Sequence, residues 1–224
     1  MTDATDLKPT IAVLGGTGNL GRGLSLRWAR AGYSVIVGSR SQDRATSAAL
    51  EISRLTGSTV LGATYRDAAR DAEIVVLAVP YMAHKSTLSD IRDAVRGKIV
   101  IDTTVPLVPP KVSRVQLPEG GSAALEAQAE LGEGVNLVAA FHNVAAAKLQ
   151  EHGSTVDCDV LVFSDVRDAR QQVVDLANAI GLKGWHAGPL ANAVVAETLT
   201  STLIFMNRHY KIEGAGIRIT GDAN

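Results

Sequence analysis

The stretch TIAVLGGTGNLG, residues 10–21, decides the fold. Its first half, TIAVLG, is a short apolar run that ends in glycine, as buried strands of parallel sheets often do. The spacing Gly16-x-Gly18-x-x-Gly21 follows, and from Leu20 onward apolar residues recur at helical intervals. A glycine pattern alone is a weak signal. Between a strand and a helix it predicts the phosphate-binding turn of a dinucleotide-binding unit.

Each glycine of that turn has a physical role. The first would make the turn, the second would let the backbone approach a pyrophosphate, and the third would let the helix pack on the strand. The helix N-terminus then presents free N–H groups and its positive dipole end to the phosphates. We therefore expect the cofactor to contact the whole turn: Gly16, Thr17, Gly18, Asn19, Leu20 and Gly21.

The rest of the chain alternates between strand-like and helix-like patterns. Apolar runs bounded by glycine or proline predict strands, and apolar residues three or four apart predict helices. This alternation predicts an α/β fold: a Rossmann-type, doubly wound parallel sheet in which the first two strands are neighbours. The expected strands are 10–15, 33–38, 58–64, 73–79, 98–104, 136–141, 159–164 and 182–187, with helices at 20–31, 45–55, 88–95, 122–131, 166–180 and 189–210.

The spacing of the elements changes after about residue 152. We therefore expect an NADP-binding Rossmann domain in residues 1–152 and a small C-terminal lobe in residues 153–224, with the cleft for a second ligand beside it. The last long helix carries apolar residues on more than one face, which indicates burial on several faces. In a chain of this size we expect part of that burial to come from a subunit interface, in a homodimer or higher homo-oligomer.

Composition limits the classes of function. Of 224 residues, 22 are basic and 23 acidic, a balance that disfavours nucleic-acid binding. The first ten residues lack the apolar core of an export signal, and the most apolar stretch is short for a membrane span. The lone cysteine, Cys158, suits a reducing compartment, so we expect a cytoplasmic protein without a membrane partner. No histidine pair has metal-site spacing, and no metal is expected.

The stretch VIVGSRSQDR, residues 35–44, indicates which dinucleotide binds. It lies about 20 residues past the glycines, where NAD enzymes place a carboxylate on the ribose 2′-hydroxyl. Here that position offers Ser39 and Arg40, with Arg44 one helical turn further on. A guanidinium suits a 2′-phosphate, whereas cations at a helix start are otherwise unfavourable. The stretch therefore favours NADP over NAD, although the arginines alone would also fit a solvated helix start.

Four segments together resemble the F420-dependent NADP oxidoreductase family, in which hydride passes between NADP(H) and the deazaflavin coenzyme F420. The first segment, IAVLGGTGNLGRGLSLRWARAGYSVIVGSR, is shared with many Rossmann proteins. The other three are more specific: AFHNVAA (140–146), AGPLANAVVAETLT (187–200) and NRHYKIEGAGIRITG (207–221).

The resemblance implies a Rossmann domain with a small C-terminal lobe, NADP as cofactor and F420 as co-substrate. It assigns NADP contacts to Thr17, Ser39, Arg40 and Arg44. Ligands of such sheets bind beyond the carboxyl ends of the strands, so the loops after the fourth and sixth strands should border the reacting rings. The residues expected there are Ala78, Val79, Pro80, His84, Ala140, His142 and Val144.

His142 is either a hydrogen-bonding residue at a helix start or a group that positions the deazaflavin. Hydride transfer between two cofactor rings requires no obligatory nucleophile, so we expect no obligatory catalytic residue, and His142 as a positioning residue. Tyr81 and Lys85 have the Y-x-x-x-K spacing of short-chain dehydrogenases, but they follow the fourth strand too closely for that role. Arg208, His209 and Lys211 either interact with the helix dipole or attract the acidic tail of F420.

The sequence therefore favours an NADP-dependent oxidoreductase that exchanges hydride with F420. An NADP-dependent imine or hydroxyacid reductase is the alternative enzyme, and it would take a catalytic lysine or aspartate from the C-terminal helix. A protein that senses NADP(H) without turnover is the alternative outside enzymes.

Overall fold

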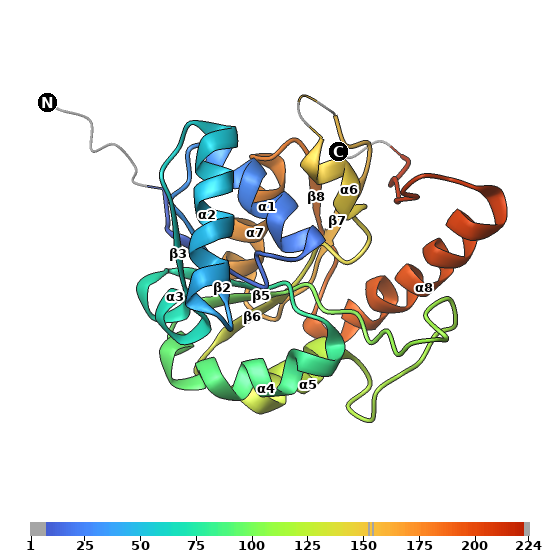
Figure 1. Ribbon diagram of the computed structural model, residues 1–224. Coiled ribbons are helices and arrows are strands. Elements are labelled where there is room, and N and C mark those ends of the chain that lie inside the picture. Colours follow the sequence, from blue (N-terminus) through green and yellow to red (C-terminus); the bar gives the residue numbers. More distant parts are fainter. Residues whose placement is uncertain (1–7, 152, 154, 222–224) are drawn as a thin grey trace, which may run out of the picture.

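The computed structural model describes residues 8–151, 153 and 155–221. The ten-residue start of the chain lies mostly outside these residues, as does His152. The main sheet has six parallel strands in the order β3-β2-β1-β4-β5-β6 (Figure 1). Because β1 lies between β2 and β4, the chain reverses its winding direction there, as in dinucleotide-binding folds. The predicted fold class and the pairing of the first two strands are confirmed.

The elements follow the predicted order, with shorter strands. The six strands of the sheet are β1 (Ile11–Leu14), β2 (Val35–Ser39), β3 (Val60–Thr64), β4 (Ile74–Leu77), β5 (Ile99–Asp102) and β6 (Asn136–Ala139). The helices between them are α1 (Asn19–Arg30), α2 (Gln42–Thr56), α3 (Tyr65–Asp71), α4 (Tyr81–Ile91) with a 3₁₀ turn at Arg92–Val95, and α5 (Ala123–Leu131). Then come α6 (Ala146–Gln150), β7 (Asp159–Val162), α7 (Arg167–Asn178), β8 (Lys183–His186), a 3₁₀ turn at Leu190–Asn192 and α8 (Ala193–Tyr210).

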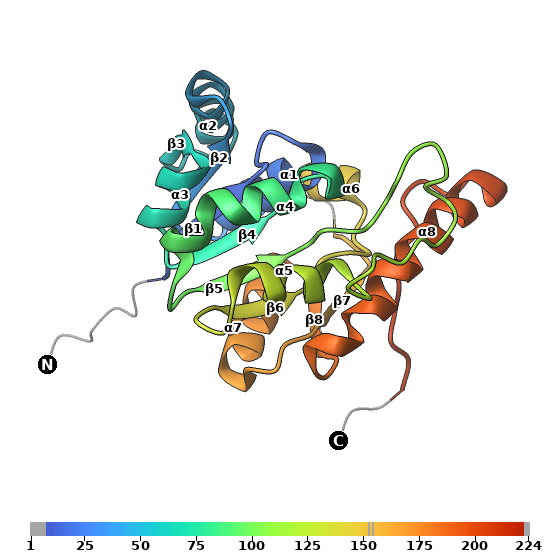
Figure 2. The same ribbon diagram turned by 90° about the horizontal axis from the view of Figure 1, so that it is seen from below.

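The sheet lies between two layers of helices, which Figure 2 shows from below. Alternate residues of each strand face opposite layers. Val13 and Val37 pack in a cluster with residues of α1, α2 and α7, whereas Leu14 and Ile36 pack in a cluster with residues of α3, α4 and α5. All four residues of β1 are fully buried, which explains the continuous apolar run in the sequence.

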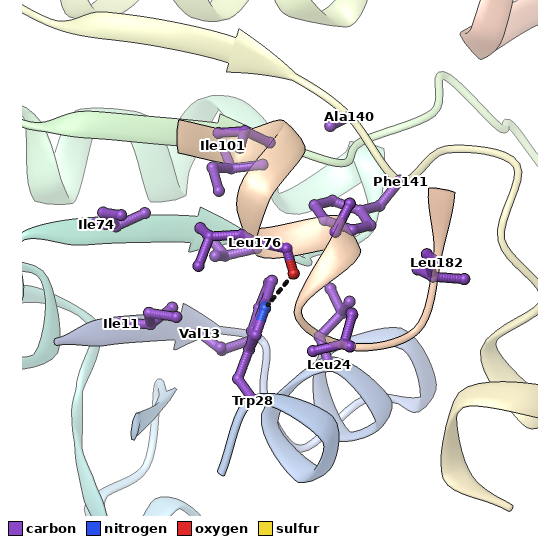
Figure 3. Close-up of a cluster of buried hydrophobic side chains, with 14 of the residues drawn as sticks. Ile11, Val13, Leu24, Trp28, Ile74, Ile101, Ala140, Phe141, Leu176 and Leu182 are labelled. Atoms are coloured by element: carbon purple, nitrogen blue, oxygen red, sulfur yellow. Dashed lines mark hydrogen bonds between the residues drawn. The ribbon is translucent and has the colours of Figure 1, made fainter. Parts of the chain in front are cut away.

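The C-terminal part joins this core directly. β7 and β8 form a separate two-stranded parallel sheet, and β7 continues into an antiparallel bridge between Phe163 and Ala139, the last residue of β6. The indole N–H of Trp28 on α1 donates to the carbonyl of Leu176 on α7 at 3.1 Å (Figure 3). Trp28 also meets the ring of Phe141 edge-on, with centroids 5.8 Å apart.

Two helices were not predicted, and the long C-terminal helix differs in detail. α3 follows β3 without a spacer, and its start is fixed by Thr64, whose hydroxyl accepts from the amide of Asp67. Pro189 begins a 3₁₀ turn rather than α8 itself. Within one chain α8 is not buried on several faces, because Val195 and Phe205 are 55% and 53% exposed. No helix in the described part of the chain is long and apolar enough to cross a membrane.

Candidate active site

The glycine turn lies between β1 and α1 at the carboxyl edge of the sheet. The residue with a left-handed backbone is Gly15, with φ +83°, which directly precedes the predicted motif. A side chain at Gly15 would also meet the carbonyl oxygen of Ala78 at 2.3 Å, so both conformation and space require glycine. A Cβ at Gly16 would lie 2.9 Å from the carbonyl oxygen of Val13, so this position has no room for a side chain either.

The third glycine has the predicted packing role. A Cβ at Gly21 would lie 2.5 Å from the carbonyl oxygen of Gly15, so any side chain would push α1 away from the turn. Gly18 is the N-cap of α1 and supplies no side-chain cap, and the first turn of α1 holds no acidic residue. Thr17, Gly18 and Asn19 are exposed. The helix start therefore presents amide N–H groups to an anion, which fits the pyrophosphate of a dinucleotide.

The end of β2 presents the residues predicted for the 2′-phosphate. Ser39 is buried at the last position of β2, and Arg40 and Arg44 are exposed. Ser41 caps α2 by accepting from the amide of Arg44, which places that arginine in the first turn. Within the described residues neither arginine forms a salt bridge, although many of the other arginines do. The two guanidinium groups therefore remain available to an anion.

Tyr65, the first residue of α3, belongs to the same edge and was not predicted. Its ring lies beside Gly38, where an added Cβ would meet it at 3.4 Å. Burial raises the pKa of its phenol, while the charge of Arg40 opposes that shift. The electrostatic interaction places Arg40 and Tyr65 near each other, at the edge where the adenosine half of a dinucleotide binds in such folds.

The loop after β4 continues the same edge toward the second half of the sheet. The amide of Ala78 donates to the carbonyl of Leu14 at 2.8 Å, which holds the loop against the glycine turn. Val79 is buried, and Pro80 is the exposed N-cap of α4. Ala78 and Val79 therefore lie against the glycine turn. That they and Pro80 contact the cofactor stays a prediction.

Tyr81 lacks the environment of a dehydrogenase tyrosine. Its hydroxyl donates to Glu126 of α5 at 2.9 Å, and Lys85 is exposed on α4. Burial and the Glu126 carboxylate raise the pKa of Tyr81 to about 12, so the phenol stays protonated. The geometry thus gives Tyr81 a structural contact between α4 and α5.

His84 is buried and bound to a carboxylate that no sequence motif indicates. Its Nε2 lies 2.8 Å from Oδ2 of Asp102, the last residue of β5, and both side chains are at most 2% exposed. Burial opposes charge on the imidazole, but Asp102 outweighs it and raises the pKa of His84. Burial likewise opposes the Asp102 carboxylate, but His84 and the amide of Thr104 lower its pKa. His84 as a cofactor contact stays a prediction.

His142 lies beyond the end of β6 in an unusual environment. The preceding residue, Phe141, has φ +67°, a conformation that side-chain-bearing residues rarely adopt. His142 is 7% exposed, and neither of its ring nitrogens has a hydrogen-bond partner among the described residues. Burial lowers its pKa to about 4, against the opposing charge of Asp102. The neutral ring therefore offers one donor and one acceptor without a protein partner.

The loop that carries His142 is fixed to α8. The side-chain amide of Asn143 donates to the carbonyl of Ala196 at 2.8 Å and to the hydroxyl of Thr200 at 3.0 Å. That hydroxyl donates in turn to the carbonyl of His142 at 3.0 Å. Ala140 and Val144 are buried on either side. We call residues 140–144 the His142 loop.

The glycine-rich C-terminal segment returns along β7. The amide of Asp159 donates to the carbonyl of Ile217 at 2.8 Å, and a Cβ at Gly216 would lie 2.7 Å from Sγ of Cys158. Burial raises the pKa of Cys158, so the thiol stays protonated. Arg218 forms an ion pair with Asp157, whereas Arg208 and Lys211 are exposed. Among the described residues no cluster of three potential ligands could hold a metal ion.

The site therefore collects the carboxyl ends of β1, β2, β4 and β6 at one edge of the sheet, as ligand sites in such folds do. Comparison with known proteins assigns the family. Residues 10–106 match the family described as NADP oxidoreductase, coenzyme F420-dependent. The F420-dependent NADP reductase of Methanothermobacter thermautotrophicus is 44% identical over 94% of this chain and 94% of its own. This chain belongs to the F420-dependent NADP reductase family.

A second relative supports this assignment, and a solved structure supports the fold. The protein of that name from Methanocaldococcus jannaschii is 39% identical over 94% of this chain and 97% of its own. The fold matches the crystal structure of a putative F420-dependent NADP reductase from Arthrobacter sp. FB24 with a TM-score of 0.78, covering 94% and 99% of the two chains at 23% identity. The family predicted from four sequence segments is confirmed.

Proposed function

We propose that this protein transfers a hydride between NADP(H) and coenzyme F420. The observation that carries the proposal is the arrangement of two different binding features on one sheet edge. Exposed Arg40 and Arg44 follow β2. A buried His142, whose ring has no hydrogen-bond partner among the described residues, follows β6. Relatives named F420-dependent NADP reductase match 94% of the chain, and their name gives both an NADP and an F420 substrate.

The residues of the first site fit NADP. The start of α1 would receive the pyrophosphate, since it presents free amide N–H groups and its first turn has no acidic residue. Ser39, Arg40 and Arg44 would hold the 2′-phosphate. Ala78, Val79 and Pro80 would border the nicotinamide. Bound NADPH supplies the hydride, and the protein supplies position.

On the second side, the His142 loop would orient the deazaflavin. A neutral imidazole can donate to a ring carbonyl or accept from a ring N–H, and burial excludes water from that contact. No step needs a charged catalytic group, which agrees with the low pKa of His142. Exposed Arg208 and Lys211 would attract the acidic tail of F420.

The direct test is to mix the purified protein with NADPH and oxidised F420 and to follow the absorbance of the deazaflavin. Bleaching that depends on both substrates supports the proposal. Tight NADPH binding without bleaching would contradict it and favour the sensor or the imine reductase. An imine or hydroxyacid reductase needs an acid or lysine from α8, but the one carboxylate of α8, on Glu197, already accepts two backbone amides.

Three further features belong to this proposal. A homodimer or higher homo-oligomer is supported by the exposed apolar side chains of Val195 and Phe205 on α8. The segment between β5 and α5 runs beside α8 in both views (Figures 1 and 2), and it adds the exposed Leu117. Light scattering that gave a monomeric mass would refute it.

The division at residue 152 is supported by the separate β7–β8 sheet. A cytoplasmic location is supported by the protonated lone cysteine.

A further inference from the structure

Glu197 is a buried carboxylate on α8 for which hydride transfer has no evident use. It is 1% exposed. Its Oε2 accepts from the amide of Ala123 at 2.8 Å, and its Oε1 accepts from the amide of Ala124 at 3.1 Å. These are the first two residues of α5, whose amides lack partners within the helix. The carboxylate therefore fixes α8 to the first turn of α5.

The same turn of α8 holds the His142 loop. Ala196 precedes Glu197 directly, and its carbonyl accepts from the side chain of Asn143. Thr200, about one turn later, bonds to both Asn143 and His142. One turn of α8 thus connects the start of α5 with the loop that carries the unpartnered imidazole. A displacement of this turn must move the loop, because three hydrogen bonds join them.

We propose that Glu197 is a positioning residue of the second-ligand site: its bonds to α5 set the position of α8, and α8 sets the position of His142. The proposal rests on the proposed function, because it assigns the His142 loop to F420. It predicts that loss of the Glu197 contacts weakens F420 binding while NADPH binding, at β1 and β2, is unaffected.

The charges around Glu197 make this contact sensitive to pH. Burial raises the pKa of Glu197 to about 7; the two α5 amides oppose this, Asp102 of β5 adds to it, and His84 of α4 opposes it. Tyr81, also on α4, is affected by the charge of Glu197 but stays protonated. Protonation turns one acceptor oxygen into a hydroxyl, which cannot accept from its amide equally well. The contact is therefore strongest above pH 7 and weaker below it.

The test compares steady-state kinetics of the full chain and Glu197→Gln between pH 5.5 and 8.5. Above pH 7 we expect the KM for F420 to rise about fivefold in the variant, equivalent to about 1 kcal/mol at 1.4 kcal/mol per tenfold. The KM for NADPH should stay within about twofold. The wild-type KM for F420 should rise as pH falls through 7, and the variant should lose this dependence. Glu197→Asp, which keeps the charge, should restore part of the affinity and the pH dependence.

Glu130→Gln is the matched control. Glu130 lies on α5 but forms an ion pair with Arg92 instead of contacting α8, so neither KM should change. An unchanged KM for F420 in Glu197→Gln would overturn the proposal. So would an equal rise in the KM for NADPH, because that result indicates general damage to the fold.

Hydrogen exchange gives a readout that does not depend on turnover. With rates normalised for pH, Glu197→Gln should exchange faster than wild type in peptides covering 120–126 and 140–146, and Glu130→Gln should not. Faster exchange at 120–126 alone would refute the coupling to the His142 loop. If the wild-type protein fails to reduce F420, the proposed function fails, and the exchange at 140–146 alone decides whether Glu197 positions the loop. If Glu197→Gln does not fold, Glu197→Asp serves for both measurements.

Discussion

Replacing Arg40 by glutamate should reverse the preference of the protein for NADPH over NADH. Arg40 is exposed at the end of β2 and has no carboxylate partner among the described residues, so its charge is free to meet the 2′-phosphate. A hydrogen bond to a charged group contributes about 1.5–3 kcal/mol, which corresponds to a factor of about 10 to 150 in affinity. Solvent screening at an exposed site favours the lower part of this range.

The assay is the ratio of kcat/KM for NADPH to kcat/KM for NADH, with F420 as acceptor. In Arg40→Glu the efficiency with NADPH should fall about 10- to 50-fold. The efficiency with NADH should rise, because a carboxylate accepts from a ribose 2′-hydroxyl. Arg54→Glu changes an exposed arginine in the last turn of α2, the helix that follows Arg40; it is the control and should leave the ratio unchanged. A ratio in Arg40→Glu within twofold of the wild-type value would refute the assignment of the 2′-phosphate site.

Three other predictions follow from the same geometry. Gly21→Ala should weaken NADPH binding at least about tenfold in a fluorescence titration, because its Cβ would lie 2.5 Å from the carbonyl oxygen of Gly15. Gly134→Ala is the control and should bind NADPH normally, because a Cβ there has no neighbour within 4 Å. His142→Ala should lower kcat about tenfold, the cost of about one lost hydrogen bond, and complete inactivity in a well-folded variant would contradict a positioning role. Asp102→Asn should destabilise the fold by about 3 kcal/mol by breaking a buried ion pair. The wild-type pair should lose stability as pH rises above about 6.5 toward the raised pKa of His84, and again as pH falls below about 4 through the lowered pKa of Asp102. A pH profile of the melting temperature that is the same in Asp102→Asn would contradict this.

The parts of the fold with local signals were predictable from the sequence. The apolar runs of β1, β2, β4 and β5 are continuous because these strands are buried on both faces, and glycines mark several helix ends. α3 was missed because its seven residues contain only two buried side chains, the alanines Ala68 and Ala69, which give no helical period. α6 was missed for a similar reason, since its one buried residue is Leu149.

The candidate site divides in the same way. The glycine turn and Arg40 were found because each lies within a short motif whose chemistry depends on neighbours in sequence. Asp102 and Glu197 were not assigned a role, because their partners lie 18 and more than 70 residues away along the chain. Only the folded sheet brings these groups together. His142 was found through the family resemblance and its place after a strand. Only the structure shows that none of the described residues forms a hydrogen bond with its ring.

The contact of Trp28 with Leu176 and Phe141 limits how this protein can be cut or recombined. Trp28 is the largest fully buried side chain of α1, and its indole N–H donates to the carbonyl of Leu176, which lies beyond position 152. A chain that ended at that position would expose the indole and the part of the sheet that α7 covers to water, so we expect it not to fold alone. We therefore expect no usable junction at residue 152 for exchanging the second lobe with that of a relative.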